Sequence, residues 1–147
     1  MQSPYLKLGL ALAINAVGMF FITYAMIASL DHFYFTINRV YMSLMMVAPM
    51  AIVMLLVMRS MYPDMKLNAA LIGGFAVLFL AMFLFARNQV VVGNDEFLRA
   101  MIPHHSSAIL MCEEASITDP EIEELCDEII ATQKREIAQM KELLGES

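Results

Sequence analysis

The side chains best suited to chemistry lie near the end of this 147-residue chain. Two consecutive histidines follow a methionine by one helical turn, and an amide, a carboxylate and another methionine come further along. The candidates are, in chain order, Met101, His104, His105, Gln133, Glu136 and Met140. Imidazole with thioether favours copper, whereas imidazole with carboxylate alone suits zinc. These residue types are compatible with a transition-metal site in which Cu(I) is favoured and zinc or another transition metal is the alternative.

Two helices are needed to bring these residues together, and residues 93–147 predict them. Gly93 and Asn94 form a helix break, after which apolar and small residues recur with a helical period. Asp119 is a natural N-cap and Pro120 a natural first-turn residue for a second helix. The tail is therefore predicted to form two antiparallel helices joined by a tight turn.

The polar candidates fall at matching levels of this hairpin. Residues at one level of an antiparallel pair have numbers that add to a near-constant sum, and His104 with Gln133 and Met101 with Glu136 both give 237. His104 is also expected on the apolar stripe, where polar groups cost desolvation unless they satisfy one another or hold an ion. The alternative is a hydrogen-bonded core histidine beside a solvated one, because adjacent helical residues point about 100° apart.

Cys112 and Cys126 also lie level with each other, with a sum of 238. Packed helices with axes about 8 to 10 Å apart can bring Cα atoms into the disulfide range of about 4.4 to 6.8 Å. A disulfide would require an oxidising compartment. Reduced packing cysteines and thiolate ligands for Cu(I) remain the alternatives.

The rest of the chain is apolar, and 60% of the whole sequence is hydrophobic while 16% is charged. Uncharged runs at 8–30, 40–58 and 67–86 are each about long enough to cross a hydrocarbon core of roughly 30 Å as a helix. We therefore predict an all-α protein with a membrane domain at 1–92, three spans, an uncleaved signal anchor and the hairpin at 93–147.

Charge predicts the orientation of the chain in a bacterial inner (plasma) membrane. With a cytoplasmic amino terminus, Lys7, Arg59 and Lys66 face the cytoplasm, against Arg39 and Arg87 outside. The positive-inside rule favours this arrangement by three to two. The hairpin is then expected to be periplasmic or extracellular.

Two function classes are disfavoured by the same charges. Residues 93–147 hold 4 bases and 13 acids, which argues against nucleic acid as a partner because phosphate binding needs clustered Lys and Arg. The predicted spans contain no ionisable side chain of the kind that marks a transport path.

Eight methionines between Met42 and Met65 invite a copper-relay interpretation, but their spacing drifts around a helix and favours packing.

The tail resembles the DUF305 family. The family pattern is an M-x-x-HH-x-x-A-x-x-M helix followed by a Q-x-x-E-I-x-x-M helix, and this chain carries it between Met101 and Met140, within a resemblance over about 93–144. The resemblance implies a ferritin-like helical module outside the cytoplasm, with members associated with copper binding and tolerance. Many members carry two such hairpins, whereas this chain carries one.

Carried over position by position, the resemblance implies ligands and polar neighbours for a metal. The implied ligands are Met101, His104, His105, Met111 and Met140. The implied polar neighbours are Asp95, Gln133 and Glu136. Ser107 stands where the family often has glycine, a change expected to affect helix packing more than ligation.

We expect a membrane-anchored protein that binds Cu(I) for buffering or handover, with a metal-handling protein as a possible partner. The alternative is a structural or regulatory membrane subunit whose hairpin docks a partner protein. An enzyme is disfavoured, because the seam lacks the multiple inward carboxylates of di-iron bundles and no nucleophile stands beside a positioned base. A lone hairpin is half of a four-helix bundle, so a homodimer or higher homo-oligomer is expected.

Overall fold

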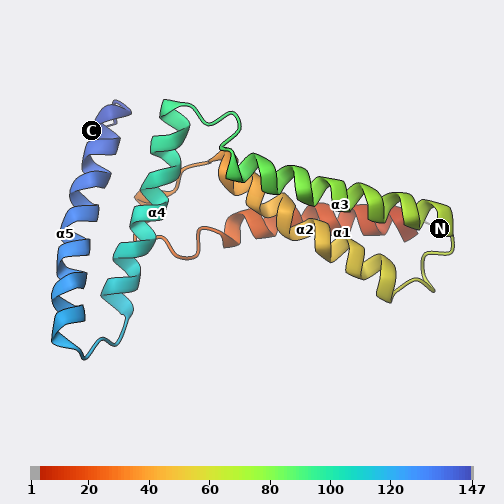
Figure 1. Ribbon diagram of the computed structural model, residues 1–147, viewed down its shortest axis with the longest axis horizontal. Coiled ribbons are helices and arrows are strands. Elements are labelled where there is room, and N and C mark those ends of the chain that lie inside the picture. Colours follow the sequence, from red (N-terminus) through yellow and green to blue (C-terminus); the bar gives the residue numbers. More distant parts are fainter. Residues whose placement is uncertain (1–3, 147) are drawn as a thin grey trace. The chain divides into compact units, whose positions relative to one another are not determined.

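The computed structural model describes residues 4–146, which form helices and connecting segments without a strand (Figure 1). In chain order the elements are α1 (Pro4–Ile22), the 3-10 turn η1 (Leu30–His32), α2 (Ile37–Val57), α3 (Met65–Arg87), α4 (Asn94–Glu114) and α5 (Pro120–Leu143). The predicted all-α fold, with three apolar helices followed by two more, is confirmed.

The described residues divide into two compact units. The apolar unit contains the residues up to Thr23 together with Asn38–Val90, and the hairpin unit contains Tyr24–Ile37 together with the residues from Val91 onward. Segment 24–37 falls within the membrane domain predicted at 1–92. Its polar side chains instead find hydrogen-bond partners on α4 and α5, so it belongs to the hairpin unit.

Each of α1, α2 and α3 is long and apolar enough to cross a membrane. The first differs from its predicted span, because α1 ends at Ile22 and residues 23–30 of the uncharged run lie outside it. α3 extends beyond its uncharged run, because Asp64 caps its first turn by accepting from the backbone N–H groups of Lys66 and Leu67 at 3.0 Å.

Apolar side chains of α1 and α2 share one buried cluster. Ala48 and Ala51 of α2 are completely buried, and Leu55 is 1% exposed against Leu8 and Leu12 of α1.

α4 and α5 lie side by side as the predicted hairpin (Figure 1). Asp119 caps α5 by accepting from the backbone N–H of Glu121 at 2.9 Å, and Pro120 follows in the first turn. The buried core, made of Ile102, Ile109, Ile137 and Met140, lies between the Cys112–Cys126 level and the end of the hairpin away from the turn. No residue from 110 to 136 is fully buried.

Candidate metal site on the helical hairpin

His105 is the histidine that faces α5. Its Nδ1 lies 2.9 Å from the backbone oxygen of Met101, and its Nε2 lies 2.9 Å from Oε2 of Glu136. A carbonyl oxygen only accepts hydrogen bonds, so Nδ1 carries a proton and donates it. A direct contact between Nε2 and the carboxylate oxygen then requires a second proton on the ring or a cation bound by both atoms. The side chain of His105 is only 12% exposed, against 43% for Glu136.

This geometry fits a metal-binding imidazole. Metal-ligating histidines usually donate their other ring N–H to a carbonyl or carboxylate, which fixes the tautomer and directs the free nitrogen. Met101 supplies that carbonyl, while its side chain packs with buried Met140 against the hairpin core. The imidazole and carboxylate donors therefore lie on the same half of the hairpin as two thioethers.

Among the described residues, no group of three or more His, Cys, Asp and Glu side chains is placed to hold a metal ion.

His104 is exposed, and the prediction that it lies on the buried stripe is wrong. Its ring centroid is 6.2 Å from that of His105, with the ring planes at 63°. The buried positions of α4 are Ile102, Pro103, Ser106 and Ile109, and this phase turns His104 outward. The prediction took the phase from Met101 and Ala108, which are only half-buried edge positions. The observed pair across the hairpin is consequently His105 with Glu136.

Three further predicted site residues are placed as follows. Asp95 is exposed in the first turn of α4, and Met111 is 60% exposed near its end. At about 1.5 Å per helical residue, they lie roughly 15 Å and 9 Å along the axis from His105, so the structure does not bring them to it. Gln133 is half-buried on α5, one turn before Glu136.

Cys112 and Cys126 form a disulfide between α4 and α5, with their Cα atoms 5.4 Å apart. No free cysteine occurs among the described residues.

Ser106 was not predicted, although it follows buried Ile102 by four residues and precedes buried Ile109 by three. It is fully buried, and its hydroxyl accepts from the backbone N–H of Ala28 at 2.7 Å. The same hydroxyl lies 2.8 Å from Nδ1 of His32, to which it can donate its own proton. Burial and the nearby charge of Lys141 lower the pKa of His32, although Asp31 opposes this shift.

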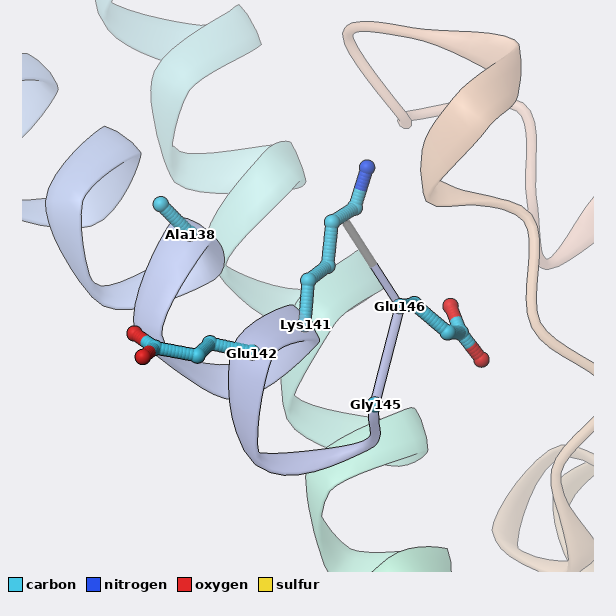
Figure 2. A pocket seen from close by; sticks show the side chains of 5 residues that line it. All are labelled: Ala138, Lys141, Glu142, Gly145 and Glu146. Atoms are coloured by element: carbon cyan, nitrogen blue, oxygen red, sulfur yellow. The ribbon is translucent and has the colours of Figure 1, made fainter.

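The segment 24–37 makes two more polar contacts, one with Lys141 of α5 and one with Glu146, which follows that helix. Lys141 pairs with Asp31 and lowers the pKa of that carboxyl, and the Tyr34 hydroxyl donates to Glu146. Burial and the bond to Glu146 raise the pKa of Tyr34 to about 12. Figure 2 shows Lys141 and Glu146 lining a pocket with Ala138, Glu142 and Gly145, so this pocket is formed by residues other than the His105–Glu136 pair.

Taken together, these features define a small all-helical protein with three apolar helices and a disulfide-linked helical hairpin that carries an oriented histidine. Residues 85–144 match the sequence profile of DUF305, which is described as a domain of unknown function. The chain is also 32% identical over 112 residues to an uncharacterized protein of Acanthamoeba polyphaga mimivirus, covering 75% of this chain and 72% of that relative. It belongs to the DUF305 family. No solved structure gives a significant match.

Proposed function

We propose that the protein is a membrane-anchored metal-binding protein whose hairpin holds copper, as Cu(I), for buffering or handover in metal homeostasis or tolerance. The observation that carries the proposal is the orientation of His105 by the Met101 carbonyl, which directs Nε2 at a carboxylate oxygen 2.9 Å away. Imidazole with thioether is a donor combination that favours copper.

The residues that would hold the ion are His105 and Glu136, with the thioethers of Met101 and Met140 nearest among the soft donors. Bound Cu(I) would supply the positive charge that otherwise has to come from a proton between Nε2 and the carboxylate. His104 is exposed beside the site. It is placed to contact an ion that enters or leaves, and it is not among the residues that would hold the bound ion.

The disulfide supports a location of the hairpin outside the cytoplasm, because disulfides persist in oxidising compartments. Three apolar helices leave the two ends of the chain on opposite sides of a bilayer, and the positive-inside rule then favours a cytoplasmic amino terminus in the plasma membrane.

The test is a Cu(I) competition titration of the full chain in detergent against a chromogenic chelator. We expect His105→Ala to weaken Cu(I) binding by about 10- to 100-fold or more, the cost that even supporting residues of metal sites show on mutation. His104→Ala is the matched control, since it removes an adjacent imidazole that does not face α5. Equal losses in the two variants, or no Cu(I) uptake by the unmodified chain, would refute the proposal.

A second candidate function is docking of the hairpin on another protein chain. Met111, Ile122 and Leu125 are 60%, 49% and 53% exposed near the turn of the hairpin, and no residue from 110 to 136 is fully buried. A second copy of the hairpin would cover these side chains by completing a four-helix bundle.

A further inference from the structure

The apolar unit contains a groove where the start of α1 meets the end of α2 and the connection to α3. Its volume is about 290 Å³. The lining side chains that matter here are Lys7, Leu8, Ala11, Met54, Met58 and Met61. All but Lys7 are apolar, so the groove offers hydrocarbon-like walls with one cation at its edge.

The neighbouring connection is held rigidly. The rings of Tyr5 and Tyr62 lie 5.4 Å apart, and Tyr62 is 3% exposed although it belongs to a connecting segment. The Tyr5 hydroxyl donates to Oδ1 of Asn68 at 3.0 Å, and Nδ2 of Asn68 donates to the Tyr62 backbone oxygen at 2.8 Å. The wall of the groove formed by this connecting segment is therefore held in place by ring packing and side-chain hydrogen bonds.

This end of the unit is positively charged. It carries Lys7, Arg59 and Lys66, against the single acid Asp64, whose carboxylate accepts from two backbone N–H groups at the start of α3. Across the described residues, no ion pair neutralises any of these three cations.

We propose that the groove binds an anionic phospholipid, with an acyl chain against the methionine-lined wall and the phosphate at Lys7. The wall belongs to helices long and apolar enough to cross a bilayer, and methionine adapts its shape to an irregular apolar ligand. Lysines at the ends of such helices extend to the interface, where they attract anionic headgroups. The positive end disfavours the other occupant that three thioethers would admit, a soft metal cation. The proposal rests on membrane anchoring and is independent of copper binding by the hairpin.

The test is native mass spectrometry of the full chain in detergent, titrated with dioleoylphosphatidylglycerol or dioleoylphosphatidylcholine. We expect a preference for the phosphatidylglycerol, and Lys7→Gln is expected to reduce that preference about fivefold, the effect of one basic residue near an anionic surface. Arg87→Gln is the matched control, because Arg87 lies at the opposite end of α3 from this site. That variant is expected to retain the preference.

A second variant tests the groove separately from the charge. Ala11→Phe fills the apolar part of the groove while leaving Lys7 in place. We expect this variant to retain less bound phosphatidylglycerol than the unmodified chain in native mass spectrometry. Equal binding of the two lipids by the unmodified chain would overturn the proposal. So would full retention by Ala11→Phe, which would assign the effect to surface charge alone. Cu(I) uptake that displaces the lipid and is lost in Met54→Leu/Met58→Leu would overturn it in favour of a metal site.

Discussion

At the scale of single residues, the buried hydroxyl of Ser106 joins the hairpin to a histidine of the segment between α1 and α2. It lies next to His105 in sequence and bonds to His32 from the segment between α1 and α2. His32 also lies near Lys141 and Asp31, whose opposite charges act on it in opposite directions. The contact between segment 24–37 and the hairpin therefore includes a titratable imidazole.

This arrangement predicts that acid weakens the contact. The pKa of His32 in the folded protein is lowered from its ordinary 6.5, mainly by burial and then by Lys141. A lowered histidine pKa means that the folded state binds fewer protons than the unfolded state, so its contribution to stability is complete above about pH 6.5 and is lost as the pH falls through the folded pKa.

We expect the backbone amide of Ala28 to exchange with solvent faster as the pH falls from 7 to 5, after correction for the intrinsic rate, because protonated His32 lies beside Lys141. His32→Gln should remove this pH dependence, and His104→Gln, which replaces an exposed histidine, should retain it. Unchanged protection of Ala28 across this range would show that His32 does not control the contact.

At the scale of elements, the hairpin is stabilised by a buried core and by a disulfide at different levels. The core of Ile102, Ile109, Ile137 and Met140 lies on the side of the Cys112–Cys126 disulfide away from the turn, and the disulfide itself joins the two helices near the turn. The disulfide joins residues 14 apart in sequence, so it restricts the unfolded chain over a short loop.

Removal of this disulfide is expected to destabilise the region around the turn by about 3 kcal/mol, the value for closing a loop of this length. Cys112→Ser/Cys126→Ser should accelerate hydrogen exchange over residues 110–126 while leaving the amides around Ile102 and Ile137 protected. Reduction of the unmodified chain should give the same result. If exchange over 110–126 stays slow after reduction, packing rather than the disulfide holds the region around the turn.

Local signals were sufficient to predict much of the hairpin. Asp119 and Pro120 mark the start of α5 by their own chemistry, and two helices joined by a short connection have few ways to pair. Local signals could not decide which of His104 and His105 faces α5. Adjacent residues of a helix point about 100° apart, and the orientation of α4 depends on which of its side chains become buried. The burial of Ser106 depends on a segment 78 residues earlier, and no local pattern of α4 records that contact.

At the scale of the whole molecule, the hairpin unit is assembled from two separate parts of the chain. Segment 24–37 joins two apolar helices, yet its polar side chains bond to α4 and α5. Ser106 and Lys141 thus attach the connection between α1 and α2 to the hairpin.

The exposed apolar side chains of the hairpin lead to a prediction about assembly. Ile122 and Leu125 lie one turn apart on α5 and are about half exposed, at 49% and 53%. A pair of hairpins related by a twofold axis would bury them in a four-helix bundle. In such a dimer, a charge substituted at either position would lie in the interface together with the same charge of the second copy.

We therefore expect the full chain in detergent to be dimeric by light scattering. Ile122→Glu/Leu125→Glu should weaken the dimer by at least about tenfold, because juxtaposed like charges in an interface cost several kcal/mol. Gln139→Glu is the control, since it adds a negative charge at an exposed polar position of α5. A dimer that persists in the double variant as firmly as in the control would place the interface elsewhere. A chain that is monomeric at every concentration at which the hairpin is folded would mean that these side chains remain uncovered in a stable hairpin.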